Sequence, residues 1–513
     1  MRRSPMQGTV DTRIPYLTSL SYLQTQNLNQ ENAKSQEALK TSIEHISTGL
    51  RVIDASDDLA GFAIADRFDV QVQGMTKALQ NTNEALSAAR IAEGSLHEYT
   101  DILGYMKELA EKAANENTTN NERMTLQEQI DNLQERLKSI SNETTFRGRK
   151  LLDGTYRTQD IQVGNSLEQI LSVSLKTARP DQIGLHEVVS EGTMNNAGSK
   201  IGFFYEMIST GVTASDSMTI QGFLGAESIS IEDDSSAKNI ADLINESSDS
   251  TGVEASAKSY AKLYDLSEAG TISFKIHGST DVSISATITS PGDLSPLYNE
   301  LESAMAATHI TPELSADGSS IHLFGYEGHN IGIESFSHST FGGNINFIGL
   351  QFDGDSTTGT GVILNDFINS TMVGGYVEFQ SDEPFILFAG TGGALFTTAS
   401  STHLPTLQAV DDIDLSTQAG AEDALTILDH ANVYVEKIRS DVQAYESGFE
   451  SIIARLESAS EQMEDSKHRV VSANLAEETM KASSATIQIQ SQSALVTQAN
   501  RLIPEYSLFL LRQ

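Results

Sequence analysis

An apolar residue falls at every seventh position over a long stretch near the C-terminal end of the chain. The row runs through Leu428, Val435, Val442, Phe449, Leu456, Met463 and Val470. A second row, offset by three positions, runs through Ala431, Ile438, Tyr445, Ile452 and Ala459. A seven-residue repeat keeps one stripe of a helix turned toward a partner helix. We therefore expect a long helix here that packs on other helices.

A later seven-residue row is out of phase with the first. It runs through Leu475, Ala482, Ile489 and Val496. Because the phase of the repeat sets the direction in which the stripe faces, this segment is predicted to contact different partners, in a separate layer.

The N-terminal arm carries the same kind of pattern. A first row, spaced by four, three and four residues, contains Leu39, Ile43, Ile46 and Leu50, and a longer row begins at Phe68, Val72, Met75 and Leu79 and continues to residue 110. A break is expected within residues 49–61, and a third helix at 126–140, entered from the turn and capping residues of 115–121. Residues 16–179 and 406–503 contain no proline, as long uninterrupted helices require.

The centre has a different character, because 26 of the 37 glycines fall within residues 181–405. Alternating segments at 271–276, 282–288, 321–324 and 376–379 predict strands, as does a pair at 161–163 and 171–175. Helices are predicted at 237–246 and 294–307. The order of strand, helix and strands occurs twice, which indicates an internal duplication within 215–350. The predicted fold class is α+β and multidomain, with long terminal helices paired as a coiled-coil-like bundle and a strand-rich insertion between them.

The net charge of −37 disfavours partners that reward clusters of Lys and Arg, namely nucleic acid and anionic membranes. The centre contributes most of this charge, with 29 Asp and Glu against five Lys and no Arg.

No cysteine is present, so disulfides and thiolate sites are excluded. No apolar run is long enough for a membrane span, and the basic start lacks the apolar region of a cleavable signal peptide. Export, if it occurs, is expected to use another route.

Residues 46–68, with the sequence ISTGLRVIDASDDLAGFAIADRF, resemble bacterial flagellin. The matched residues are Gly49, Leu50, Arg51, Asp57, Asp58, Ala60, Gly61, Ala63, Ile64 and Ala65. Further segments follow in the family's order at 91–98, 126–133, 144–154, 474–484 and 498–511, and the centre around Ile244 and Asn245 resembles a small motif of flagellins and hook-associated proteins. The chain departs from the pattern at Arg147, where Asn is usual, and after Ile14, where Pro15, Tyr16 and Leu17 stand in place of Asn-Thr-Asn. Translation from Met1 or from Met6 is compatible with that start.

The resemblance implies a structural subunit that is exported unfolded and polymerises into the flagellar filament for swimming motility, outside the cell and without a cleaved signal peptide. It implies inner-layer helices at 1–45 and 471–513, a helical rod at 46–180 and 406–470, and an outer variable domain at 181–405. Implied partners are other copies of the chain, the flagellar export apparatus, a flagellin chaperone, and hook-associated and cap proteins. The alternative is a hook–filament junction protein, which shares the terminal helices.

The predicted self-assembly and helix-packing residues come from the apolar rows and from the resembling segment. They are Leu39, Ile43, Ile46, Leu50, Arg51, Asp57, Asp58, Phe68, Val72, Met75, Leu79, Val435, Val442, Phe449, Leu456, Met463, Leu475, Ile489 and Val496. In flagellins that activate the vertebrate innate immune receptor, an Arg and a Leu four residues later stand where this chain has Tyr105 and Leu109. The resemblance therefore implies weak activation.

Three other motifs contain residue types that occur in chemical sites. The pair Asp57-Asp58 could bind metal or act in acid-base chemistry, but adjacent acids between helices are interpreted as a cap or an inter-subunit contact. The pairs at 97–98 and 186–187 begin like a zinc-protease motif, yet neither has the second His that the motif requires. The acidic cluster at 232–234 is interpreted as a cap for the helix at 237. We therefore predict no enzyme, cofactor or metal site.

Overall fold

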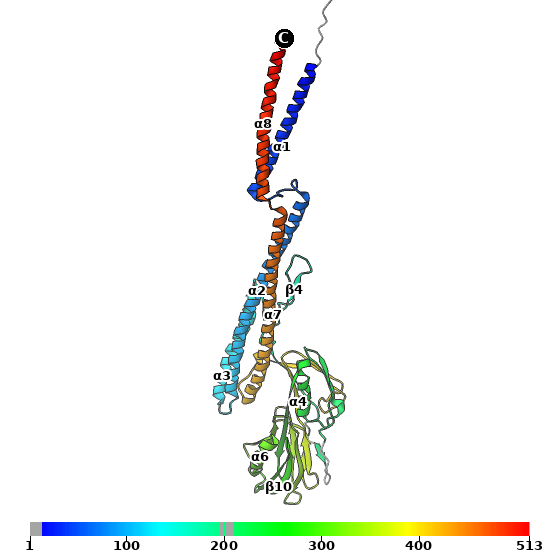
Figure 1. Ribbon diagram of the computed structural model, residues 1–513. Helices are drawn as coiled ribbons and strands as arrows, with labels where there is room; N and C mark the ends of the chain where they lie inside the picture. Colours follow the sequence, from blue (N-terminus) through cyan, green and yellow to red (C-terminus); the bar gives the residue numbers. More distant parts are fainter. Residues whose placement is uncertain (1–12, 195, 197, 201–208, 512–513) are drawn as a thin grey trace, which may run out of the picture. The chain divides into compact units, whose positions relative to one another are not determined.

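The computed structural model describes residues 13–194, 196, 198–200 and 209–511. Long helices occupy both ends of the chain (Figure 1), as the apolar repeats predicted. The helices are α1 (Arg13–Thr48), α2 (Leu59–Ala114), α3 (Asn120–Glu143), α4 (Ala237–Glu246), α5 (Ser248–Thr251), α6 (Ser295–Thr308), α7 (Gln418–Val471) and α8 (Leu475–Leu511). The choice between Met1 and Met6, and the first part of the expected N-terminal layer, lie outside the described residues.

The chain forms two compact units, each built from segments distant in sequence. The first contains Met1–Ser87, Gln159–Val173 and Tyr445–Gln513, and the second contains Ala88–Thr158 and Ser174–Ala444. In the first unit, α1 packs along α8, and α2 packs on α7 through a small apolar cluster around Met75, Ala78 and Leu456. The Lys467 ammonium also pairs with the Asp69 carboxylate at 2.5 Å. The hairpin of β3 (Gln159–Gln162) and β4 (Ile170–Val173) belongs to this unit.

In the second unit, α3 begins at a complete capping box. The Thr119 hydroxyl accepts from the Glu122 amide, and the Glu122 carboxylate accepts from the Thr119 amide at 2.9 Å. The buried Arg123 guanidinium donates to the Ala113 carbonyl at 2.8 Å, which closes the turn between α2 and α3. The polar segment at 115–121 therefore stops one helix and starts the next, as its composition predicted.

The strands of the second unit form antiparallel sheets. One sheet has the order β11-β10-β14-β17-β6, a second has the order β12-β13-β9-β18-β5-β21 with β15 and β16 beside β9, a third has the order β20-β19-β7-β8, and β1 pairs with β2. The bounds are β1 (Thr145–Phe146), β2 (Arg149–Lys150), β5 (Gly184–Val189), β6 (Gly198–Lys200), β7 (Met218–Gln221), β8 (Ala226–Ile229), β9 (Glu254–Tyr264), β10 (Gly270–His277), β11 (Val282–Ile288), β12 (Thr311–Leu314), β13 (Ser320–Gly325), β14 (Ile331–His338), β15 (Ile345–Leu350), β16 (Thr357–Leu364), β17 (Ser370–Val373), β18 (Tyr376–Ser381), β19 (Ile386–Phe388), β20 (Thr402–His403) and β21 (Thr406–Ala409).

Two separate apolar cores stabilise this strand-rich part. One lies around α4 and includes Ile240, Ile244 and Phe379, while the other lies around α6 and includes Leu297 and Ile272. The strand β9 is shared, because its first half contributes to the α4 core and its second half to the α6 core. The hairpin β7–β8 precedes α4, as the hairpin β10–β11 precedes α6, so the same element order occurs twice.

The two residues at the centre of the small repeated motif have distinct physical roles. Ile244 is fully buried in the α4 core. The side chain of Asn245 accepts from the Ala255 amide at 2.7 Å and donates to the Ala255 carbonyl at 2.9 Å. These two hydrogen bonds join the end of α4 to the start of β9 and fix the position of the helix along the strand.

The structure corrects the interpretation of the acidic cluster at 232–234. The helix α4 is capped by Ser236, whose hydroxyl accepts from the Asn239 amide at 3.2 Å. Asp233 instead accepts from the Ala214 amide, and Asp234 accepts from the Ser209 hydroxyl. The Ser236 hydroxyl lies directly before the helix and reaches its first free amides, so the carboxylates of Asp233 and Asp234 stabilise a neighbouring loop instead.

Two other predicted bounds differ from the structure. The helix predicted at 294–307 begins one residue later, at Ser295, and Leu175 lies beyond the end of β4.

Candidate assembly site

Two short segments join the long helices of the first unit, residues 49–58 and 472–474, and we call them together the elbow. Backbone hydrogen bonds connect the two segments. The Arg51 amide donates to the Val471 carbonyl at 2.6 Å, and the Ala473 amide donates to the Gly49 carbonyl at 2.9 Å. A β-bridge joins Leu50 and Ser472. Gly49 has a φ of 70°, a backbone conformation that glycine adopts without steric cost. The elbow therefore ends α1 and α7 at one place.

Arg51 and Asp58 hold the elbow from both sides. The Arg51 guanidinium donates to the Val470 carbonyl at 2.9 Å and lies 3.5 Å from the Asp58 carboxylate. Asp58 accepts from the amides of Ala60 at 3.1 Å and Gly61 at 3.0 Å, which makes it the N-terminal cap of α2. The amide of Gly61 and the nearby Arg51 lower the pKa of Asp58. The family-like pair thus works at a turn, as the cap interpretation expected.

Asp57 stabilises the other side of the same turn. Its carboxylate accepts from the amides of Ile53 at 2.9 Å and Asp54 at 3.2 Å. The imidazole of His45 lies 4.0 Å from this carboxylate. Both acids of the pair therefore accept hydrogen bonds from backbone amides, which is a structural use of carboxylates.

The contact between α1 and α8 includes small and polar side chains beside the half-buried Leu39, Ile46, Ile489 and Val496. Over residues 22–48 of α1 and 475–498 of α8, where side chains are described, the buried residues are Ser35, Ser42, His45, Glu478 and Ala485. The Ser35 hydroxyl donates to the side-chain carbonyl of Gln488 at 3.4 Å, and the His45 imidazole lies 3.5 Å from the Glu478 carboxylate. Lys481 lies 2.8 Å from the same carboxylate and lowers its pKa. We call these polar contacts the polar seam.

Large apolar side chains lie on the exposed faces of the same unit. They are Tyr22, Leu23 and Ile43 on α1, Leu59, Phe62, Ile64 and Val70 at the start of α2, and Leu475, Met480, Ile487 and Leu495 on α8. Met480 is 67% exposed and Ile487 is 66% exposed. These side chains lie along three helices and offer apolar surface that another molecule can cover.

The predicted packing residues divide into three groups by burial. Met75, Val435, Val442, Phe449 and Leu456 are buried. Leu39, Ile46, Leu50, Asp58, Phe68, Val72, Leu79, Met463, Ile489 and Val496 are half-buried. Ile43, Arg51, Asp57 and Leu475 are exposed. The first heptad row therefore packs inside the subunit, while the rows of α1 and α8 are only partly covered.

Sequence reasoning missed both the polar seam and part of the exposed apolar set. Phe62, Val70, Met480, Ile487 and Leu495 were not among the predicted assembly residues. Their spacing does not continue the predicted rows, since Phe62 precedes the row from Phe68 and Met480 falls between Leu475 and Ala482. The usable signal was the presence of large apolar residues on helices whose opposite faces carry Ser and Ala.

The motifs that begin like a zinc-protease site do not form one. His97 lies 3.7 Å from Asp101 on the exposed face of α2, and Glu98 pairs with Arg136. Glu187, on β5, lies opposite Gln380 of β18. Within the described part of the chain, no helix is long and apolar enough to cross a membrane.

The chain belongs to the α+β class. It combines a strand-rich insertion with long terminal helices whose apolar side chains are partly exposed in the single subunit. Comparison with known proteins identifies the family. Residues 20–157 match the bacterial flagellin N-terminal helical region, residues 425–504 match the bacterial flagellin C-terminal helical region, and residues 217–263 match the flagellin hook IN motif. The chain belongs to the bacterial flagellin family, whose members are structural subunits of the flagellar filament.

The match to relatives extends over almost the whole chain, as two of them show. B-type flagellin of Pseudomonas aeruginosa is 30% identical, and the match covers 96% of this chain and 99% of that protein. Flagellin of Aquifex pyrophilus is 27% identical over 95% of this chain and 99% of that protein. FliC of Burkholderia pseudomallei, a solved structure, is 15% identical with a TM-score of 0.28, and covers 71% of this chain and 98% of its own. That score is too low to carry any argument.

Proposed function

We propose that the chain is exported unfolded and polymerises through its terminal helices into the extracellular flagellar filament, which serves swimming motility. The observation that carries this proposal is the exposed apolar surface of α1, α8 and the start of α2. Burying one large apolar side chain stabilises a contact by about 1.5–3 kcal/mol. Several such side chains per subunit supply enough free energy for assembly.

The domain assignment is part of this proposal. Residues 1–45 and 471–513 form the inner layer, residues 46–180 and 406–470 form the rod, and residues 181–405 face outward as a domain with a duplication within 215–350. The balance of −24 charges in 181–405 supports the outward position, because a strongly acidic surface is best solvated by water. The repeated order of hairpin and helix supports the duplication.

The assembly partners follow from the same function. The subunit contacts other copies of itself, the flagellar export apparatus, a flagellin chaperone, and the hook-associated and cap proteins. It reaches the outside without a cleaved signal peptide, and it has no catalytic role, no nucleic-acid partner and no membrane insertion. Intact-mass measurement of protein sheared from cells tests the export route, since a mass short of the N-terminal residues by a signal-peptide length would contradict it.

Electron microscopy of purified protein after induced polymerisation tests the main proposal. Full-length chain is expected to form long filaments, while chains lacking residues 1–45 or 471–513 are expected to form none. Filaments from either truncated chain would show that the terminal helices are dispensable, and the proposal would fail.

A matched pair of point variants separates assembly from folding. Leu495→Asp places a charge on the exposed apolar face of α8, and Leu404→Asp makes the same change at a position in the loop between β20 and β21 that is 69% exposed. A charge buried without a partner costs several kcal/mol, so the Leu495 variant should need at least about tenfold more protein to polymerise. The Leu404 variant should polymerise like the unchanged chain. Equal polymerisation of both variants would refute the assignment of this face.

The alternative is a hook–filament junction protein, which shares the terminal helices but forms a short ring instead of a long polymer. The Asp-Asp-x-Ala-Gly segment at 57–61 and the Gln-Ala-Asn segment at 498–500 favour a filament subunit. Sedimentation of the polymerised protein distinguishes the two functions, because a junction protein would stop at small oligomers.

A further inference from the structure

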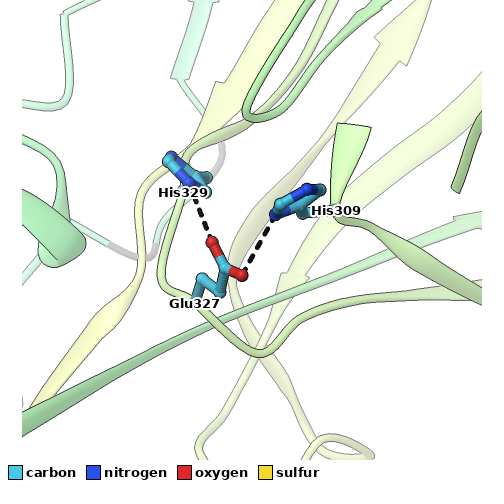
Figure 2. A group of neighbouring side chains, drawn as sticks. All are labelled: His309, Glu327 and His329. Carbon is cyan, nitrogen blue, oxygen red and sulfur yellow. Dashed lines mark ion pairs between the residues drawn. The ribbon is translucent and has the colours of Figure 1, made fainter. Parts of the chain in front are cut away.

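Two histidines and a glutamate meet at the end of α6. His309 follows this helix, while Glu327 and His329 lie in the turn between β13 and β14. The Nδ1 atom of His309 lies 3.0 Å from Oε1 of Glu327, and the Nε2 atom of His329 lies 3.3 Å from Oε2 of the same carboxylate. Figure 2 shows both imidazoles turned toward the carboxylate between them. The three possible ligand atoms all lie within 4.8 Å of one another.

The backbone under Glu327 and His329 is held firmly. The Gly328 amide donates to the Gly325 carbonyl at 3.1 Å, which closes a tight turn. The Gly328 carbonyl accepts from the Lys238 amide at 3.0 Å, and the His329 carbonyl accepts from the Ser259 hydroxyl at 2.6 Å. A side chain at position 328 would meet Ala257 at 2.3 Å, so the turn fits only glycine there.

The backbone under His309 is also fixed. The His309 amide donates to the Met305 carbonyl at 2.9 Å, and its φ of 54° is left-handed. On either side, the Thr308 carbonyl accepts from the Ser279 amide at 2.8 Å and the Ile310 side chain is buried. The three side chains remain 45%, 50% and 23% exposed for His309, Glu327 and His329, so they can rotate while their backbones stay in place.

We propose that His309, Glu327 and His329 form a binding site for a divalent transition metal ion of the Zn²⁺ type. Imidazole nitrogens and a carboxylate suit Zn²⁺ and its neighbours, whereas Mg²⁺ and Ca²⁺ prefer oxygen ligands alone. Three protein ligands leave the remaining coordination position to water. The bound ion ties the end of α6 to the turn between β13 and β14.

The site needs only small side-chain movements to accept the ion. Two ligands bound at about 2.1 Å in tetrahedral geometry are separated by roughly 3.4 Å. The present separations exceed this by no more than about 1.4 Å, which rotations of the exposed His309 and Glu327 side chains can supply. The carboxylate lies between the two imidazoles and would neutralise one of the two charges of the ion. The acidic surroundings of the central domain also favour a cation.

Calorimetric titration of the full-length monomer with Zn²⁺, after treatment with a chelator and in excess Mg²⁺, tests the proposal. The Mg²⁺ occupies acidic surface groups that bind cations without imidazole. We expect one Zn²⁺ per chain, and at least about tenfold weaker binding in each of His309→Asn, Glu327→Gln and His329→Gln, since each removes a ligand. Asn at position 309 tolerates the left-handed backbone, so this variant retains the fold.

A second histidine cluster provides the control. His277 lies near Asp281 and Glu334, but Lys275 also pairs with both acids and already neutralises them. His277→Gln should therefore leave Zn²⁺ binding unchanged. Titration with Co²⁺ should give the visible absorption of a tetrahedral site in the unchanged chain and in the His277 variant, and lose it in the other three. Absence of binding, or binding that survives the three substitutions or falls equally in the control, would overturn the proposal.

Discussion

Glu187→Gln should change how the stability of the central domain depends on pH. Glu187 on β5 lies opposite Gln380, diagonal to Glu378 of β18, and the two carboxyl groups are hydrogen-bonded to each other. Burial and the neighbouring Glu378 charge raise the pKa of Glu187 to about 9. Burial alone would also raise the pKa of Glu378, but the bond from Glu187 and the ammonium of Lys258, 3.4 Å away, lower it. The pair therefore shares one proton, which resides on Glu187.

The sign of the effect follows from proton binding. Between the ordinary carboxyl pKa of 4.5 and about 9, folded Glu187 holds a proton that the unfolded chain releases. The contribution of this proton to the free energy of unfolding is therefore fully present below that range. It falls as the pH rises through the range. One pKa unit corresponds to about 1.4 kcal/mol, so the fall between about pH 5.5 and pH 8 has a ceiling near 3.4 kcal/mol. Because Glu187 retains some solvent contact and the pair can relax, we expect about 2 kcal/mol.

Gln at position 187 is neutral at every pH and can still donate to Glu378. The variant should match the unchanged chain near about pH 5 and exceed its free energy of unfolding by about 2 kcal/mol near pH 8. Urea unfolding of the monomer, followed by near-ultraviolet circular dichroism of the tyrosines, measures this difference. Glu227→Gln, at an exposed position on β8, is the matched control and should keep the original pH dependence. If Glu187→Gln keeps the original slope as well, the shared-proton argument is wrong.

Three further predictions concern the helices. Asp58→Ala removes the cap of α2 and should destabilise the monomer to urea by about 1 kcal/mol; an unchanged midpoint would contradict the cap. Gly49→Ala should cost about 1 kcal/mol, because φ is 70°, whereas Gly94→Ala within α2 should stabilise by about 1 kcal/mol, since an added Cβ there meets no described atom within 4 Å; thermal unfolding of the two variants should shift in opposite directions. Purified monomer should activate an innate immune receptor reporter weakly, because Tyr105 and the buried Leu109 stand in the corresponding segment, and a potent response would refute this.

The long helices and many strands were predictable because their burial follows simple periods. The heptad row from Leu428 to Leu456 is buried throughout α7, and the alternating segment at 282–288 matches the bounds of β11. In such elements one face meets a continuous apolar core, so the sequence pattern and the burial pattern coincide. The helix α4 was predictable for the same reason, since Ile240 and Ile244 lie one turn apart on its buried face.

The histidine–glutamate cluster was not predictable from local sequence. His309 is separated from Glu327 by a strand, a turn and a second strand, and only the pairing of β12 with β13 brings the two together. A motif search detects ligands at fixed spacing on one helix, and this site has no such spacing. The shared proton of Glu187 and Glu378 was hidden likewise, because the strand register that places these acids together is set by contacts far along the chain.

The out-of-phase apolar rows of the terminal helices predict two layers of contact, and the contact between α1 and α8 differs from that between α2 and α7. Between α2 and α7 the contact around Met75 and Leu456 is apolar, so this pair can be stable in a single subunit. Between α1 and α8 the contact includes the polar seam, whose hydrogen bonds and ion pairs contribute little net free energy in water. The large apolar side chains that stay exposed on this pair can add stability through further contacts. The same sequence pattern thus serves the fold of one subunit in one helix pair and, as we propose, assembly of the filament in the other.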